Sequence, residues 1–354
     1  MSSAPDTAAP PSALLEVQNL VVSFKGRTRR APRIRAVRDV SFTVGVGETL
    51  GLVGESGSGK STVARAITRL VEPDAGSVRL DGTDLLQLGR SEMQRTRRHV
   101  QMVFQDPYSS MNPAMVIGNV IGEPLEVQLG LKGAERNARV AELLEQVGLS
   151  RRHVERYPYE FSGGQRQRIA IARAIATNPK LVILDEAVSA LDVSTQNQII
   201  NLLEQLQADL GVSLLFIAHD LAVVRHIAAR TAVMYLGELM EVGPSERIFT
   251  DPAHPYSEAL LSAVPIPDPR KQRAKERIVL GGDPPDPANP PAGCPFVARC
   301  PYALPDLCAQ VKPERTPVDG GGVTACHLQT AGPVLAGKPL TALPVELRRE
   351  LIHR

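Results

Sequence analysis

Tryptophan is absent from this sequence of 354 residues, and the other aromatic residues are only six tyrosines and seven phenylalanines. So few aromatic rings argue against a surface on which nucleic-acid bases or sugars stack. Lysine and arginine together exceed aspartate and glutamate by two charges, and this near-neutral balance gives no support to a general nucleic-acid binder. We therefore expect no nucleic acid among its partners.

Long apolar runs are also lacking, because none approaches the roughly 18 residues that a membrane-spanning helix needs. The first residues have neither a basic segment nor an apolar one, so we do not expect a secretory signal. Ser, Ala and Pro dominate residues 1–13, which predicts a disordered leader because such residues bury too little surface to offset ordering. We expect the protein in the cytosol.

The composition is otherwise that of a globular protein, with 43% hydrophobic and 22% charged residues. Apolar runs at 49–53, 181–185 and 213–218 are typical of strands in a buried parallel sheet. Apolar residues recur at helical spacing in 63–70 and 196–207, and this alternation predicts an α/β core. Further elements are expected as strands at 15–24, 37–44 and within 77–104 (broken by an arginine-rich segment at 90–98), and as helices over most of 115–160 and at 344–353.

Residues 54–61 form a glycine-rich loop that fits the pattern G-x-x-x-x-G-K-S/T. The loop follows an apolar strand and opens a helix, so its backbone N–H groups can surround phosphate oxygens at a helix N-terminus. Lys60 can reach the β- and γ-phosphates of a nucleotide, and the Ser61 hydroxyl can ligate Mg²⁺. The candidate phosphate-binding residues are Gly54, Glu55, Ser56, Gly57, Ser58, Gly59, Lys60, Ser61 and Thr62.

A second nucleotide element is the apolar run 181–184, which ends in two acidic residues. Asp185 at the strand end can hold Mg²⁺, usually through water. Glu186 then lies beside the γ-phosphate and can polarise an attacking water molecule. The two elements together predict a protein that binds and hydrolyses a nucleoside triphosphate.

Residues 161–168, Phe-Ser-Gly-Gly-Gln-Arg-Gln-Arg, carry a resemblance to the ATP-binding cassette (ABC) ATPases. Their signature motif is Ser-Gly-Gly-Gln at a helix start, and Ser162 is a good N-cap for such a helix. The resemblance extends to Gln105 as the Q-loop glutamine, Asp192 as the D-loop aspartate, and His219 as the switch histidine. Phe24 resembles the aromatic residue that stacks on adenine, although a phenylalanine at a strand end is often a core residue.

The resemblance to the ABC ATPases covers residues 15 to about 250 and implies a fold, a dimer and the roles of individual site residues. It implies a RecA-like P-loop ATPase core, a small antiparallel β subdomain and a helical subdomain inserted at about 107–176, within a nucleotide-binding domain at 14–264. It also implies a head-to-tail dimer in which one subunit's signature contacts ATP on the partner's phosphate loop. The implied catalytic residues are Lys60, Gln105, Glu186 and His219, the Mg²⁺ ligands are Ser61, Gln105 and Asp185, and the signature contacts are Ser162, Gly163, Gly164 and Gln165.

A narrower resemblance, to the ATPases of oligopeptide/dipeptide importers, appears at 104–113, at 157–164, at 254–265 and in the cysteine-containing region. The sequence of these segments is most similar to that of the F-type subunit, which pairs with a paralogous D-type subunit. That family implies two integral membrane permeases, an extracytoplasmic peptide-binding protein and a place on the cytoplasmic face of the membrane. Ala187 departs from the family, which usually has proline there, and Tyr159 stands where histidine is common.

All four cysteines lie beyond residue 265, where the composition turns proline-rich. Cys294, Cys300, Cys308 and Cys326 are separated by five, seven and seventeen residues, and a cytosolic ATPase favours metal binding over disulfides. The resemblance to the importer C-terminal region, 265–330, points to a 4Fe–4S cluster, while a zinc site or free thiols stay open. His327 is a possible substitute ligand. Because this module is far in sequence from the nucleotide motifs, we expect ATP binding not to depend on it.

Two further segments and several rival functions stay open. The basic insert holds Lys25, Arg27, Arg29, Arg30, Arg33, Arg35 and Arg38. It is either a solvated hairpin loop or a contact for anionic lipid or a membrane partner. The tail 331–354 has little pattern.

The substrate could also be a nickel complex or glutathione. The rival functions are those of a soluble ABC ATPase and of a redox or metal sensor, but the chain has one cassette, no notable heptads and an intact Glu186 and His219.

Overall fold

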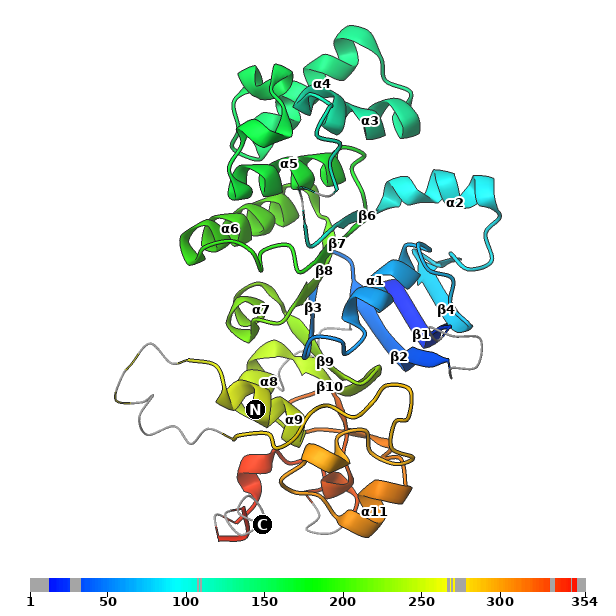
Figure 1. The fold of residues 1–354 in the computed structure, drawn as a ribbon, viewed down its shortest axis with the longest axis vertical. Coiled ribbons are helices and arrows are strands. Elements are labelled where there is room, and N and C mark those ends of the chain that lie inside the picture. The colour runs from blue at the N-terminus through cyan, green and yellow to red at the C-terminus, as the bar shows by residue number, and fades with distance from the viewer. Residues whose placement is uncertain are drawn as a thin grey trace, which may run out of the picture.

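The structure is a computed structural model that describes residues 13–25, 33–106, 108, 110–265, 268, 270, 278–331, 335–344 and 346–348. Its elements form two sheets, a group of helices at one end and a C-terminal region at the other (Figure 1). The predicted leader therefore lies outside the described residues, except for Ala13, which begins a strand. Arg27, Arg29 and Arg30 of the basic insert also lie outside them.

The larger sheet has eight strands in the order β11-β12-β10-β9-β3-β8-β7-β6. Its parallel part consists of β6 (Val100–Val103), β7 (Leu181–Asp185), β8 (Ser213–Ala218), β3 (Thr49–Val53) and β9 (Arg230–Tyr235). Every residue of β3, β7 and β8 is buried, which explains why these strands are continuous apolar runs in the sequence. The predicted α/β core and these three strands are confirmed.

Helices pack on this sheet at short range. They are α1 (Lys60–Ile67), α6 (Val193–Leu210), α7 (Leu221–Ile227) and α8 (Ser245–Thr250). A Cβ atom on Gly51 of β3 would lie 2.3 Å from the Val224 side chain of α7. Glycine at this position therefore lets α7 approach the central strand β3, which leads into the glycine-rich loop.

The smaller sheet is antiparallel and runs β2-β1-β4-β5. Its strands are β1 (Ala13–Phe24), β2 (Ile34–Gly45), β4 (Ala75–Leu80) and β5 (Thr83–Asp84). Its buried face belongs to the same apolar cluster as α1, so the two sheets are joined by one core.

Some charges of the basic insert have partners within the chain. Arg33 pairs with Asp74 at 2.6 Å, and Arg38 lies 3.5 Å from Glu238. The segment at 90–98 forms the helix α2 (Arg90–Thr96) and a 3₁₀ turn, η1 (Arg97–His99), rather than a simple break between strands. The ion pairs of Arg33 and Arg38 thus neutralise two charges of the basic insert within the chain itself.

The group of helices at one end consists of α3 (Ile117–Leu129), α4 (Gly133–Gln146) and α5 (Gly163–Ile175), with two 3₁₀ turns, η2 (Arg151–Glu155) and η3 (Pro158–Glu160). The helical spacing in the sequence correctly predicts the buried face of α4, formed by Val140, Leu143 and Leu144. Across the described ranges, the helices are too short or too polar to cross a bilayer.

The C-terminal region continues the larger sheet, so the composition change near residue 265 does not start a separate sheet. Strand β10 (Glu238–Pro244) pairs with β12 (Val323–Ala325), which pairs with β11 (Arg315–Pro317). The remaining elements of this region are α9 (Pro255–Ser262), α11 (Pro305–Gln310) and the 3₁₀ turns η4 (Val297–Arg299), η5 (His327–Gln329) and η6 (Leu340–Ala342).

Glu241 of β10 fixes the segment that follows α8, at residues 253–254. Its carboxylate is fully buried, accepts hydrogen bonds from the backbone N–H groups of Ala253 (2.9 Å) and His254 (3.1 Å), and pairs with the buried Arg247. Buried charges are tolerated only where they are paired and hydrogen-bonded in this way. The carboxylate thus fixes the start of α9 against the sheet.

We predict that Glu241→Ala lowers the free energy of unfolding by about 3–5 kcal/mol, because it leaves the Arg247 guanidinium buried without its partner. Urea denaturation followed by circular dichroism measures the change. Glu246→Ala is the matched control, since Glu246 pairs with Arg225 at an exposed site and should cost at most about 1 kcal/mol. Equal losses for the two variants would contradict this account of Glu241.

Candidate nucleotide-binding site

The glycine-rich loop has a backbone that only glycine allows at several positions. Gly54, Gly57 and Gly59 have φ angles of 154°, 80° and 105°, in a region that residues with a Cβ atom rarely adopt. A Cβ atom would also lie 2.1 Å from the Met234 carbonyl oxygen at Gly54, and 2.3 Å from the Ala36 carbonyl oxygen at Gly59. The loop is therefore fitted between β9 and β2, and it delivers Lys60 to the first position of α1.

Lys60 is buried in the loop that it follows. Its Nζ donates hydrogen bonds to the carbonyl oxygens of Gly54 and Glu55, both at 2.8 Å. Burial lowers the pKa of Lys60, while the nearby carboxylates of Glu186, Asp185 and Glu55 act in the opposite direction. The ammonium group thus lies among acidic groups at the place where a polyphosphate would enter.

Ser61 and Asp185 bring two oxygen atoms together at the end of β7. The Ser61 hydroxyl donates to Asp185 Oδ1 at 2.7 Å. Burial raises the pKa of Asp185, although the bond from Ser61 opposes this. A hydroxyl and a carboxylate suit Mg²⁺, which keeps several waters and takes only one or two carboxylates beside the substrate's phosphates. The donor set therefore fits this ion.

Two side chains from the ends of other strands lie beside the Glu186 carboxylate. Gln105, after β6, donates its amide to Glu186 Oε2 at 2.8 Å, and His219 Nδ1, after β8, lies 3.6 Å from the same oxygen. Glu186 itself has a φ angle of 48°, which turns its side chain away from the line of β7. The structure thus brings together Gln105, Glu186 and His219, as the sequence predicts, and Lys60, Ser61 and Asp185 adjoin them.

The turn after Glu186 is closed although Ala187 replaces the usual proline. The Glu186 amide donates to the Ile217 carbonyl at 2.9 Å, which ties the turn to β8. The Ser189 amide and hydroxyl both donate to the Glu186 carbonyl, at 3.2 and 2.9 Å. These three bonds hold the carboxylate in place without the ring of a proline.

The residues of the signature motif cap α5 and pack on α6. Ser162 and Gln165 form a reciprocal capping box, with bonds of 3.3 and 3.0 Å. A Cβ atom on Gly164 would lie 2.3 Å from the side chain of Thr195, whose amide donates to Asp192 at 2.9 Å. The side chains nearest to Cβ atoms placed on Gly163 and Gly164 are those of Leu191 and Thr195, so the signature motif lies against the segment that leads into α6.

Phe24 ends β1 and leaves its ring 42% exposed. Its strand partner is Ile34, two residues before Ala36, whose carbonyl lies against Gly59 of the loop. The ring is therefore at the sheet end that borders the phosphate loop, and it is open to a planar ligand.

The four cysteines are free, and Cys294, Cys308 and Cys326 are buried. Burial, reinforced by the neighbouring thiols, raises the pKa of Cys294 to about 11 and raises the pKa values of Cys300 and Cys326. Cys294 and Cys308 are joined by a backbone hydrogen bond of 2.8 Å. However, no group of three or more His, Cys, Asp or Glu side chains in the described ranges is placed to hold a metal ion. The sulfur chemistry of the predicted 4Fe–4S cluster fits, but the arrangement of the thiols does not support it.

The C-terminal region reaches the phosphate loop, although the two segments lie far apart in the sequence. Arg299, at the end of η4, makes two bonds to the Glu55 carboxylate, at 2.7 and 3.1 Å. The Glu55 amide donates to the Tyr256 hydroxyl at 2.9 Å. The sequence contains no signal for these contacts, because each residue lies in a segment of unrelated pattern, and Arg299 is 244 positions from Glu55.

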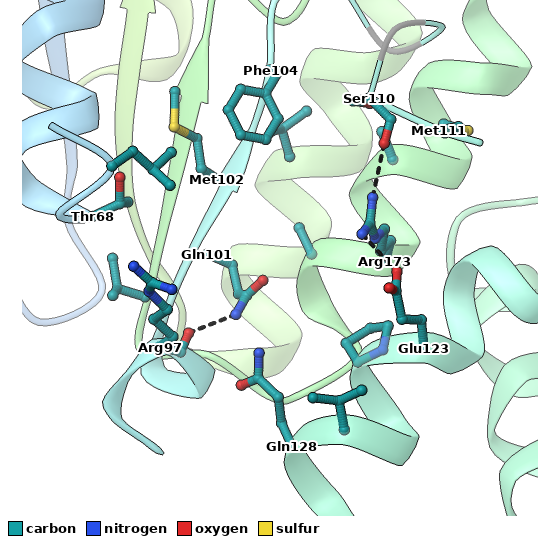
Figure 2. A pocket seen from close by; sticks show the side chains of 17 residues that line it. Thr68, Arg97, Gln101, Met102, Phe104, Ser110, Met111, Glu123, Gln128 and Arg173 are labelled. Atoms are coloured by element: carbon teal, nitrogen blue, oxygen red, sulfur yellow. Dashed lines mark hydrogen bonds and ion pairs between the residues drawn. The ribbon is translucent and has the colours of Figure 1, made fainter. Parts of the chain in front are cut away.

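A cavity of about 320 Å³ lies between β6 and the helices α3 and α5 (Figure 2). Its wall includes Phe104, directly before Gln105, and Arg173 of α5. Arg173 donates to the Ser110 carbonyl at 2.9 Å and to Glu123 of α3 at 2.8 Å, so it joins two sides of the cavity (Figure 2).

Two family models match this chain. Residues 37–189 match the ABC transporter family, and residues 240–308 match the oligopeptide/dipeptide transporter C-terminal region. Among solved structures, a dimeric ATP-binding cassette, MJ0796, bound to ADP and Pi is 31% identical, with a TM-score of 0.58 over 65% of this chain and 98% of that one. CbiO1 from Clostridium perfringens is 26% identical, with a TM-score of 0.59 over 67% and 90%.

Curated relatives are similar over most of their length. A probable peptide ABC transporter ATP-binding protein of Sinorhizobium fredii is 50% identical over 321 residues, which are 90% of each chain. The oligopeptide transport ATP-binding protein OppF of Haemophilus influenzae is 50% identical over 320 residues, which are 88% of this chain and 96% of that protein. The chain therefore belongs to the ATP-binding proteins of ABC transporters, in the group that carries the oligopeptide/dipeptide C-terminal region.

Proposed function

We propose that this protein hydrolyses ATP and powers an ABC importer of oligopeptides or dipeptides. The observation that carries the proposal is the convergence of Gln105 and His219 on Glu186 Oε2, beside the pair formed by Ser61 and Asp185. These groups come from α1 and from the ends of three parallel strands. The peptide class of the substrate is supported by the names of the relatives.

In this proposal Glu186 is the general base that takes a proton from the attacking water. His219 and Gln105 orient its carboxylate, and Lys60 moves from its loop carbonyls to the phosphates. Mg²⁺ would be held by Ser61, Asp185 and Gln105, and it neutralises phosphate charge when bound. Phe24 would stack on adenine, and the backbone N–H groups of 54–62 would bind the phosphates.

The second half of each ATP site comes from a partner subunit in our proposal. The signature residues Ser162, Gly163, Gly164 and Gln165, together with Asp192, lie on a face formed by α5 and α6 rather than beside the chain's own loop. A head-to-tail dimer would place that face over the partner's phosphate loop, and closure on ATP would drive the transport cycle. We infer a paralogous D-type subunit as the partner, in line with the F-type resemblance.

Two permeases and an extracytoplasmic peptide-binding protein complete the proposed importer, with this chain on the cytoplasmic face of the membrane. The cavity beside Phe104 is suited to a permease contact, because its walls include the residue before Gln105 and the helix that begins with the signature motif. A segment bound there would touch both halves of the ATP machinery. Co-purification with membranes separates this role from that of a soluble ABC ATPase, and uptake assays separate peptides from nickel complexes or glutathione.

We propose the following division of the chain: the nucleotide-binding domain at 14–264, its helical subdomain at about 107–176, the importer C-terminal region at 265–330 and a tail at 331–354. We also retain metal binding by the four thiols as a proposal. What supports it is that all four are free and that a backbone bond of 2.8 Å holds Cys294 beside Cys308.

Glu186→Gln should lower ATP turnover in the assembled transporter by about 10²–10⁴-fold, because an amide cannot accept the proton. ATP binding should persist, and an ATP-bound dimer should accumulate, as measured by size exclusion in the presence of Mg²⁺ and ATP. Glu204→Gln is the control, since Glu204 faces His226 at 3.7 Å away from the site. Near-wild-type turnover of Glu186→Gln would remove the general-base assignment.

Lys60→Ala should abolish tight ATP binding to the isolated subunit, because the ammonium group is the cation within the loop. Ser162→Arg should leave that binding intact but reduce hydrolysis at the site on the partner's loop. Equilibrium titration of each purified variant with Mg²⁺-ATP measures the first effect, and turnover of the mixed dimer measures the second. The head-to-tail proposal is wrong if Ser162→Arg weakens binding to the isolated subunit as much as Lys60→Ala does.

If the thiols hold a 4Fe–4S cluster, anaerobically purified protein should be brown and contain about four irons per chain. Double replacement of Cys300 and Cys308 by Ser should remove the colour and the iron. One tightly held zinc would indicate a zinc site instead. Metal-free protein would rule out a metal centre, and the thiols of Cys294, Cys300 and Cys326 should then react slowly at pH 7, as their raised pKa values imply.

A further inference from the structure

The geometry assigns Arg299 of the C-terminal region as a positioning residue that sets the charge and the conformation of the phosphate loop through Glu55. Its two nitrogens meet the two carboxylate oxygens at 2.7 and 3.1 Å, the fork-like pairing that is the strongest form of ion pair. The Arg299 side chain is 9% exposed and that of Glu55 is 28% exposed, so the pair is partly shielded from solvent. This inference rests on the proposed ATPase function.

Arg299 lies against Tyr235, one of three buried aromatic rings that pack together. Its guanidinium lies 5.9 Å from the centroid of the Tyr235 ring and 3.4 Å from the Tyr235 hydroxyl. The rings of Tyr235, Tyr256 and Phe296 contact one another with centroids 4.7–5.3 Å apart. Since Tyr256 also accepts the Glu55 N–H bond at 2.9 Å, one rigid cluster fixes both the side chain and the backbone of Glu55.

The ion pair between Arg299 and Glu55 offsets a negative charge in the phosphate loop. Glu55 belongs to the loop that must receive the negative phosphates, and its carbonyl oxygen accepts a 2.8 Å bond from Lys60 Nζ. An unpaired carboxylate there would repel ATP and compete with it for Lys60. Arg299 neutralises that carboxylate and holds it on the side of the C-terminal region.

The test is calorimetric titration of the purified full chain with Mg²⁺-ATP, together with thermal melting. Arg299→Ala and Arg299→Gln should each weaken ATP binding roughly tenfold to a hundredfold, as expected for loss of hydrogen bonds to a charged group. Arg299→Lys, which keeps the charge, should recover part of the loss. In the assembled transporter the KM for ATP should rise more than kcat falls. Arg315→Ala is the control, since Arg315 also links this region to the core, through the Asp39 carbonyl at 3.0 Å, and it should bind ATP like the wild type.

The decisive variant is the double replacement of Arg299 by Ala and Glu55 by Gln. Because it removes the unpaired carboxylate, it should bind ATP more tightly than Arg299→Ala alone, which a purely structural role for Arg299 does not predict. Wild-type affinity in Arg299→Ala, equal affinity in the Lys and Gln variants, or further loss in the double variant would overturn the inference. If Arg299→Ala does not fold, the Lys and Gln variants, each with and without Glu55→Gln, give the same comparison. Failure of the wild-type chain to bind ATP would instead contradict the proposed function.

Discussion

The accumulation of charge at the end of the parallel strands is the constraint on which the rest of this structure depends. Lys60 is buried beside three carboxylates, those of Glu55, Asp185 and Glu186. Each carboxylate has a fixed partner: Arg299 for Glu55, Ser61 for Asp185, and Gln105 with His219 for Glu186. The fold can therefore keep an acidic, water-activating site next to the place where a polyanion binds, because these partners hold or offset the negative charges.

The parallel strands explain why these partners come from distant parts of the chain. The ends of β6, β7 and β8 meet at one edge of the sheet, and that edge is where Gln105, Glu186 and His219 stand. The signature motif lies elsewhere, on the face that α5 and α6 share. This separation gives the proposed head-to-tail dimer its role, because a site divided between two chains is complete only when they close.

The sequence predicts the parts of the fold that follow a simple pattern. Strands β3, β7 and β8 are continuous apolar runs, and the loop between β3 and α1 is defined by glycines that the backbone requires. Strand β10 is harder to recognise, because it carries the buried acids Glu238 and Glu241 in place of apolar residues, and their partners lie elsewhere in the chain. The bond from Arg299 to Glu55 is not predictable for the same reason: it depends on tertiary contacts between two segments, neither of which has a period or motif that indicates the other.

The C-terminal region thus contacts the phosphate loop, through Arg299 and Glu55, and also extends the sheet. Arg299, beside the Tyr235 ring, meets Glu55 of the phosphate loop, while the cavity beside Phe104 lies between β6 and the helices α3 and α5. The central claim, that this machinery powers peptide uptake, is tested most directly in vesicles that contain the full transporter, ATP in the lumen on the chain's side, and the peptide-binding protein outside. The account predicts that labelled peptide crosses into the lumen only while ATP is hydrolysed there. Peptide uptake that is independent of ATP, or hydrolysis that never moves a peptide, would contradict it.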